Sequence, residues 1–222
     1  MNPSVRHHQH GLASRGLLLI VMALSIFGML APRAALGDDR VVWQALRSGN
    51  HVALIRHALA PGFGDPPHFE IGKCATQRNL SDQGRQQAVA MGDRFRSYGI
   101  DAARVYSSQW CRCLETAERL ALGPVAPLPA LNSFFEDFAK KETQMQQLRA
   151  WLVQQDLTQP LVLVTHQVNI TALTGVYPLS GEMVVIHPTA SNQWHVLNSV
   201  AMDCVKETDR RDGRNAGRNC LC

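Results

Sequence analysis

The chain has 222 residues, 45% of them hydrophobic and 18% charged, which is enough for one domain with a full core. Its 22 basic and 18 acidic residues give a net charge of +4, but the first 37 residues hold three of the arginines and no acid. The remainder is therefore nearly neutral, at +1. The overall basic charge gives no argument for a nucleic-acid partner, and we expect none.

The first 37 residues have the pattern of a secretory signal peptide. Arg6 and Arg15 precede an apolar run over residues 16–30, and Ala35 and Gly37 are the small residues that a signal peptidase reads. About 15 apolar residues are fewer than the roughly 20 of a membrane-spanning helix, so an uncleaved anchor is the less favoured alternative. We expect a periplasmic or secreted protein without a membrane span after cleavage. Its three parts would be a signal peptide over 1–37, a domain over 38–200 and a polar tail over 201–222.

Two apolar runs end in a histidine. Residues 51–55 and 161–165 are rich in Val, Leu and Ile, as in strands buried on both faces, and they lead into His57 and His166. Parallel sheets bind ligands just beyond the carboxyl ends of their strands. If the two strands are neighbours, the two histidines face one crevice.

Arginines belong to the same predicted edge. Arg56 directly precedes His57, and a short strand over 103–107 leads into a helix over 110–122 whose first turn carries Arg112. Guanidinium groups and helix N-termini both favour phosphate, and a neutral imidazole can attack phosphorus. The group therefore indicates phosphoryl chemistry, for which neither a metal nor an organic cofactor is needed.

The other periodic segments complete an α/β pattern. A helix over 84–98 is predicted, with Ser81 as its N-cap and Gly99 at its end. Arg78 is either a phosphate contact or the start of the turn before this helix, and the turn is favoured. A second helix is expected over 141–155. Two further strands, over 183–186 and 194–197, would extend one side of a doubly wound sheet. His51, His68, His187 and His195 are given no catalytic role.

All six cysteines follow the expected signal peptide, which favours disulfides in an oxidising compartment. Cys111 and Cys113 do not face each other on a helix and would need separate partners, so we expect Cys74 to pair with one of them. A Cys-x-Cys metal site is the alternative. The remaining cysteines, which would clip the tail, are Cys204, Cys220 and Cys222.

Four segments of the chain, in order and spacing, resemble the histidine phosphatase superfamily, or phosphoglycerate-mutase-like group. They are Leu54-Ile-Arg56-His57-Ala58, the run from Arg78 to Ala88, the run from Ser107 to Ala117, and Val164-Thr-His166. The resemblance covers roughly residues 50–199 and implies a three-layer α/β/α fold with a mostly parallel sheet. It also implies that His57 becomes phosphohistidine, while Arg56, Arg112 and His166 hold the phosphoryl oxygens.

The general acid departs from the family's patterns. Ser133 stands where one branch has a glutamate, and Gln167 stands where another has an acid after the second histidine. Glu136 is our candidate, with Asp137 and Asp65 after it. The alternative is that Glu136 and Asp137 only begin the following helix, because acids are favoured in a first turn.

These features predict an exported phosphomonoesterase that acts on a small phosphorylated substrate. Some exported relatives, as the resemblance implies, act on phosphorylated envelope sugars. Selectivity would come from residues 60–69 and from Phe134 and Phe135. The rivals are an inactive phosphate- or phospho-glycan-binding module, which the missing standard acid favours, and a phosphomutase, which export disfavours.

Overall fold

The part of the chain that the computed structural model describes, residues 39–189 and 193–202, contains one mixed sheet of six strands. Their order is β3-β2-β4-β1-β5-β6; the first four are parallel to one another, β5 runs antiparallel to β1, and β6 runs antiparallel to β5. The strands are β1 (Val52–Arg56), β2 (Arg104–Ser107), β3 (Val125–Pro127), β4 (Leu161–Thr165), β5 (Met183–Pro188) and β6 (Trp194–Val200).

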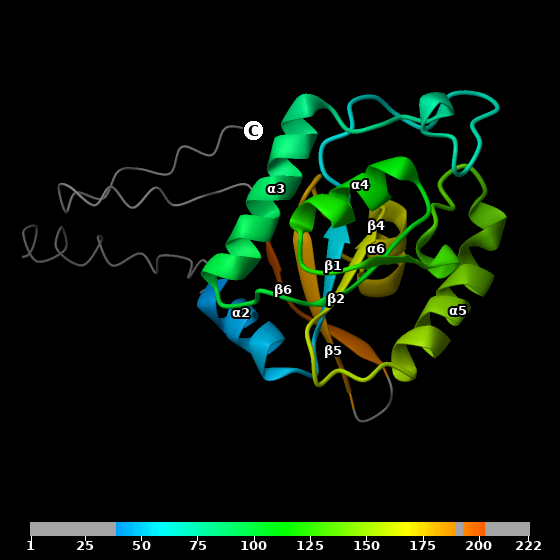
Figure 1. Ribbon diagram of the computed structural model, residues 1–222. Helices are drawn as coiled ribbons and strands as arrows, with labels where there is room; N and C mark the ends of the chain where they lie inside the picture. The colour runs from blue at the N-terminus through cyan, green and yellow to red at the C-terminus, as the bar shows by residue number, and fades with distance from the viewer. Residues whose placement is uncertain (1–38, 190–192, 203–222) are drawn as a thin grey trace, which may run out of the picture. The chain divides into compact units, whose positions relative to one another are not determined.

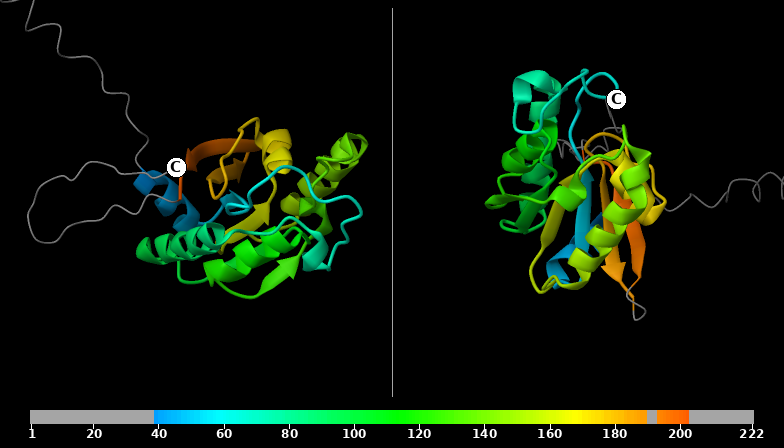
Figure 2. Two further views of the ribbon diagram at one scale, coloured as in Figure 1. Left: turned by 90° about the horizontal axis from the view of Figure 1, so that it is seen from above. Right: turned by 90° about the vertical axis from the view of Figure 1, so that its right-hand side faces the viewer.

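Helices cover both faces of this sheet, so the expected three-layer α/β/α fold is confirmed (Figures 1 and 2). Helices α2, α3 and α4 contribute to one hydrophobic cluster, and α5 and α6 contribute to the other. The helices are α2 (Asp39–Ser48), α3 (Asp82–Ser97), α4 (Cys111–Leu120), α5 (Lys141–Val153) and α6 (Gln167–Thr174). Short 3₁₀ turns are η1 (Cys74–Thr76), η2 (Pro129–Leu131) and η3 (Phe138–Lys140).

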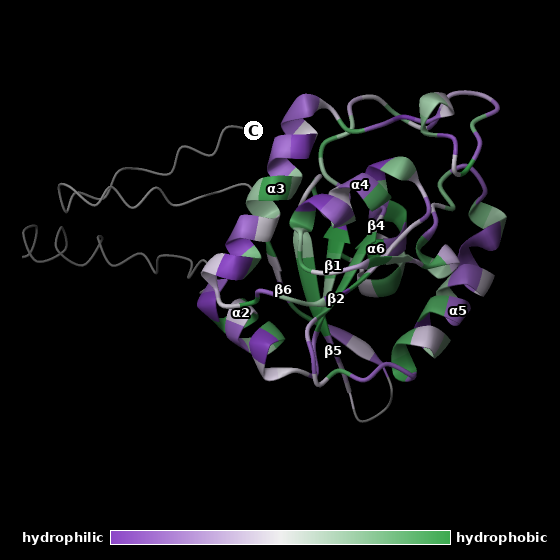
Figure 3. Ribbon diagram, in the orientation of Figure 1, coloured by the Kyte–Doolittle hydropathy of each residue, from purple (hydrophilic) through white to green (hydrophobic). Residues whose placement is uncertain are grey.

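The central strands divide their side chains between the two clusters. In β1, Ala53 and Ile55 join the cluster of α2, α3 and α4, whereas Val52 and Leu54 join that of α5 and α6. The alternation follows from the period of two along a strand. Because both faces are covered, every position but the last in β1 is buried, which explains its continuous apolar sequence (Figure 3).

The start of α3 is packed tightly against the segment that follows β1. Ser81 is the N-cap, as expected, and its hydroxyl accepts a hydrogen bond from the Gly84 N–H at 3.0 Å. The Ser81 N–H donates to the Leu59 carbonyl at 3.1 Å. A Cβ atom at Gly84 would lie 2.1 Å from that carbonyl oxygen, so only glycine fits. This contact fixes the chain two residues beyond His57.

A disulfide joins Cys74 to Cys111, with 5.6 Å between the Cα atoms. It links the β1–α3 loop (residues 57–81) to the start of α4, as expected for one of the two α4 cysteines. The separate partner expected for Cys113 is wrong: this residue is a free thiol and is fully buried.

Several sequence expectations differ from the structure or lie beyond it. Helix α2, helix α6 and strand β3 were not predicted; β3 and α6 are short, three and eight residues, and α2 starts just after the expected cleavage point. Within the described residues, no helix has the length and apolar character needed to cross a membrane. The expected signal peptide and Cys204, Cys220 and Cys222 lie outside the described residues.

Candidate active site

Strand pairing brings the two histidines together. Strands β1 and β4 are parallel neighbours with Arg56 opposite Thr165, and the His57 N–H donates to the Thr165 carbonyl at 2.9 Å. The next residue on each strand is therefore a histidine, and the centroids of the His57 and His166 rings are 5.5 Å apart. Both line a cavity of about 360 Å³ beyond the strand ends.

His57 is held in one tautomer. Its Nδ1 lies 2.8 Å from the Ala58 carbonyl oxygen, which can only accept, so Nδ1 carries the proton and Nε2 keeps its lone pair. The ring is 3% exposed, and burial, followed by the charge of Arg112, lowers its pKa well below the ordinary value. A neutral imidazole with a bare Nε2 is the nucleophilic form.

Arg56 and Arg112 each have a guanidinium N–H without a partner. Nε of Arg56 and Nε of Arg112 are buried and make no hydrogen bond within the described residues. Arg112 is only 3% exposed, while the other end of the Arg56 guanidinium donates to the Pro178 carbonyl at 2.9 Å. Buried donors are nearly always paired, so these two indicate a missing acceptor. Both residues line the cavity.

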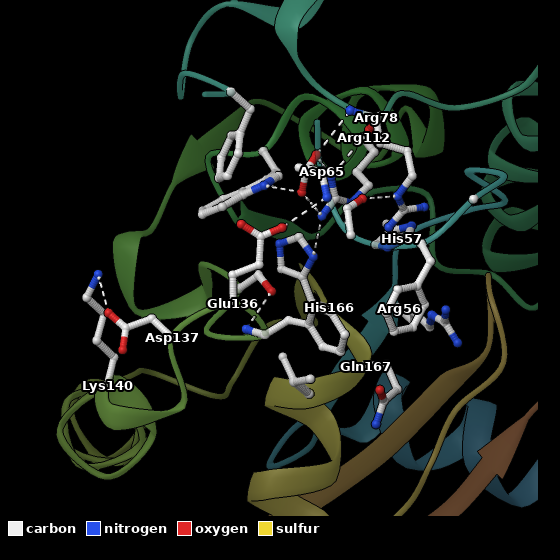
Figure 4. Close-up of a pocket in the computed structure, with 18 of the residues that line it drawn as sticks. Arg56, His57, Asp65, Arg78, Arg112, Glu136, Asp137, Lys140, His166 and Gln167 are labelled. Carbon is white, nitrogen blue, oxygen red and sulfur yellow. Dashed lines mark hydrogen bonds and ion pairs between the residues drawn. The ribbon is translucent and has the colours of Figure 1, made fainter. Parts of the chain in front are cut away.

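Asp65 is paired with Arg112 inside the cavity (Figure 4). Its two carboxylate oxygens accept from Nη1 at 2.8 Å and Nη2 at 3.0 Å, and also from the Arg78 N–H and Trp110 Nε1 at 3.0 Å each. Burial acts to raise the pKa of Asp65, but the hydrogen bond and charge of Arg112 hold it below the ordinary value. The reserve role of general acid expected for Asp65 therefore fits poorly, because this carboxylate is held ionised.

Arg78 lies at the cavity rather than only in a turn. We favoured the turn before α3, but its side chain lines the cavity and donates through Nε to the Gly64 carbonyl at 2.7 Å and through Nη1 to the Ala60 carbonyl. Burial lowers the pKa of Arg78, as it does that of Arg56. Both side chains stay charged, because the guanidinium group does not lose its proton in proteins. Arg78 follows a long irregular loop, so no periodic sequence pattern indicated where its side chain lies.

His166 rests on a buried polar chain. Arg112 Nη2 donates to its Nδ1 at 3.5 Å, so the proton lies on Nε2, which donates to the Ser108 hydroxyl at 2.9 Å. Ser108 in turn donates to Oδ1 of Asn132 at 3.3 Å. Burial and the charge of Arg112 lower the pKa of His166 well below the ordinary value. Ser108 and Asn132 thus orient His166, although nothing in their sequence context marked them.

The thiol of Cys113 lies beside the same ring, with Sγ 3.5 Å from Nε2 of His166. Burial raises the pKa of this thiol to about 12, so it stays protonated and packs as a small apolar group.

Glu136 lines the cavity as expected, and it does not begin a helix. Helix α5 starts at Lys141, after the turn η3. The Glu136 carboxylate accepts from the Asp65 N–H at 3.0 Å, which turns it toward the β1–α3 loop (Figure 4). Asp137 also lines the cavity but forms an ion pair with Lys140 at 3.0 Å. Gln167 donates to Thr171 within α6 and supplies no acid.

The charges of this site suit a dianionic phosphate. Three guanidinium groups, on Arg56, Arg78 and Arg112, line the cavity, and the carboxylate of Asp65 forms an ion pair with only one of them, Arg112. A phosphate monoester carries close to two negative charges at neutral pH. Among the described residues, no group of three or more His, Cys, Asp and Glu is placed to hold a metal ion. The arrangement can bind a phosphoryl group and present a nucleophile to it.

The chain is similar in sequence to known proteins. The sequence model of the histidine phosphatase superfamily (branch 1) matches residues 52–159. A mitochondrial serine/threonine-protein phosphatase Pgam5 from Drosophila virilis is 33% identical over 72 residues, which are 32% of this chain and 22% of that protein. The matched segment thus spans about a fifth of the relative.

Solved structures share the fold. The product of open reading frame Rv3214 from Mycobacterium tuberculosis gives a TM-score of 0.51 at 15% identity, over 67% of this chain and 96% of that one. A mutant phosphoserine phosphatase from Entamoeba histolytica, in complex with phosphoserine, gives 0.50 at 14% identity, over 68% and 97%.

Proposed function

Because the chain belongs to the histidine phosphatase superfamily, we propose that it hydrolyses phosphate monoesters through a phosphohistidine on His57. The observation that carries this proposal is the state of the His57 ring. Its Nδ1 donates to the Ala58 carbonyl, which leaves Nε2 without a proton, and the residue lines a cavity together with three arginines. A histidine with a purely structural role would not require three arginines beside it.

The first step is attack by His57. Nε2 forms a bond to phosphorus as the bond between phosphorus and the ester oxygen breaks. The depressed pKa keeps the imidazole neutral even below pH 6.5, so the lone pair is available. Charge on the equatorial oxygens is met by Arg56, Arg78 and Arg112, whose positions are set before the substrate arrives.

The unpaired N–H groups give Arg56 and Arg112 a specific task. We propose that each guanidinium donates to a phosphoryl oxygen, because both residues line the cavity and neither Nε has another partner among the described residues. Asp65 keeps the plane of the Arg112 guanidinium fixed through its two hydrogen bonds. His166 completes the cradle, because its ring lines the cavity with its centroid 5.5 Å from that of His57.

Glu136 is proposed as the general acid and base. In its protonated form it gives its proton to the leaving oxygen. The resulting carboxylate then takes a proton from water, whose oxygen attacks phosphorus, the P–N bond breaks, and His57 is regenerated. Glu136 is supported by its place on the cavity and by the alternatives: Asp65 is held ionised by Arg112, and Asp137 is paired with Lys140.

Export to the periplasm or beyond is part of the proposal. The signal-like first 37 residues and the Cys74–Cys111 disulfide support it, since stable disulfides form in oxidising compartments. A phosphorylated envelope sugar is the proposed substrate class. N-terminal sequencing of the protein from the periplasmic fraction would test export: cleavage after Gly37 is expected, and an intact N-terminus would favour a membrane anchor.

The chemistry is tested by rapid acid quench of the oxidised protein with 4-nitrophenyl phosphate. We expect an acid-labile, base-stable phosphoryl adduct on His57, formed before phosphate is released. The His57→Ala variant should form no adduct and show no turnover. Phosphate binding without an adduct, at any pH, would instead identify a phosphate-binding module.

A further inference from the structure

The cavity lining also contains aromatic and apolar side chains. Among them are Phe63, Phe135, Val168 and Tyr177. Two of these side chains are highly exposed, Phe63 at 86% and Tyr177 at 68%. The rings of Phe63 and Phe135 come from separate segments and meet edge to face, with 4.9 Å between their centroids. This pair forms an aromatic rim at the cavity.

Phe63 is exposed, but hydrogen bonds hold the backbone next to it. Glycines with positive φ angles, Gly62 at 96° and Gly64 at 64°, flank it and allow the tight bend that turns it outward. Arg78 ties down the carbonyl of Gly64, and Glu136 binds the N–H of Asp65. An exposed aromatic side chain held on both sides by hydrogen bonds is typical of a binding surface.

The charges at the rim argue against a second anionic group on the substrate. Of the described residues that line the cavity, the cations besides the three phosphate-facing arginines are confined to Lys140, and this ammonium is paired with Asp137 at 3.0 Å. A second phosphate or a carboxylate beside the scissile ester would therefore meet no unpaired cation there.

We propose that the site selects phosphate monoesters whose leaving group is uncharged and packs a flat or apolar face against Phe63 and Phe135. This inference rests on the proposed phosphatase function. An aromatic ring and the C–H face of a sugar ring both offer such a face. Bisphosphates and phosphorylated acids are excluded by the same site.

Steady-state kinetics with four esters tests the selectivity. We expect 2-naphthyl phosphate and glucose 1-phosphate to exceed 3-phosphoglycerate and glucose 1,6-bisphosphate in kcat/KM by tenfold or more. The opposite order, or equal values, would overturn the inference while leaving the phosphatase function intact.

The Phe63→Ala variant locates the subsite. It should raise KM for 2-naphthyl phosphate by about fivefold, in line with a lost aromatic contact, and leave the inhibition constant of inorganic phosphate unchanged. Phe63 is almost fully exposed, so the variant should fold, and Val89→Ala, an exposed site on α3, is the matched control. A loss confined to the naphthyl ester would assign an aromatic leaving group, and a loss shared with glucose 1-phosphate a sugar. An unchanged KM, or equal weakening of phosphate, would refute the subsite.

Binding to the His57→Ala background separates this test from that of catalysis. Calorimetry should show 2-naphthyl phosphate binding more tightly than inorganic phosphate, and Phe63→Ala should remove that difference. If no ester is hydrolysed yet this difference persists, the proposed function fails and the subsite stands. If hydrolysis occurs without this difference, the subsite fails.

Discussion

The Cys74–Cys111 disulfide allows a worked prediction of stability. It closes a loop with a sequence separation of 37 residues. In the chain-entropy model such a cross-link lowers the entropy of the unfolded chain by about 13 cal/mol/K, which is about 3.8 kcal/mol at 25 °C. We therefore expect Cys74→Ser to lower the free energy of unfolding by up to that amount, and Tm by roughly 8–15 °C for a domain of this size.

Activity at low temperature should change much less than stability. Other contacts still join the β1–α3 loop to α4: Gln77 Oε1 accepts from the Cys111 N–H at 2.9 Å, and Asp65 keeps its ion pair with Arg112. At 15 °C we expect kcat/KM to stay within about threefold of wild type. The Arg112 guanidinium should shift very little, so it should keep most of its electrostatic stabilisation of the transition state.

Urea titration followed by tryptophan fluorescence gives the free energy of unfolding, and an aryl phosphate assay gives kcat/KM. Cys111→Ser and the double variant are the controls, because each removes the same cross-link and should lose the same free energy. A Cys74→Ser protein as stable as wild type would refute the entropic argument. Loss of activity in a fully folded variant would show that the disulfide, rather than the polar contacts, holds the site.

Three further predictions concern the site and its support. Glu136→Gln should lower kcat/KM, which reports the phosphorylation step, about 10²-fold for an alkyl phosphate but far less for 4-nitrophenyl phosphate, whose leaving group needs no proton; equal losses of kcat/KM would remove Glu136 as the acid. Gly84→Ala should cost about 2–4 kcal/mol of stability in a thermal melt, because its Cβ would overlap the Leu59 carbonyl oxygen, whereas a neutral result would mean that α3 can shift. The free energy of unfolding should fall as pH drops below about 6.5, by up to roughly 1.4 kcal/mol per pH unit for each of His57 and His166. Their pKa values are depressed in the folded state, so the unfolded chain binds more protons there. Replacing both histidines with Asn should flatten that slope, and an unchanged slope would assign it to other groups.

The core of the site could be predicted because its residues directly follow periodic elements. His57 and His166 come straight after buried strands, and parallel pairing then places them side by side. Arg112 could be placed for a similar reason, since it lies in the first turn of a helix that follows a strand. In each case a local pattern and one topological rule sufficed.

The parts that failed depend on contacts between distant segments. Arg78 and Asp65 lie 13 residues apart in an irregular loop, and their positions follow from hydrogen bonds to Gly64, Trp110 and Arg112 rather than from any period. The free thiol of Cys113 likewise reflects burial against His166, which cysteine spacing does not encode.

The ladder between β1 and β4 has a consequence for how this protein can change. No bond joins His57 to His166 among the described residues; their separation is inherited from the pairing of Arg56 with Thr165. A slip of one residue would move one ring by about 3.3 Å and also turn every β1 side chain to the opposite helical layer. Such a slip would therefore disrupt both the packing of the core and the arrangement of the two catalytic histidines. Mutations that keep the domain stable therefore preserve the distance between the two imidazoles, and surrounding loops can diverge without loosening it.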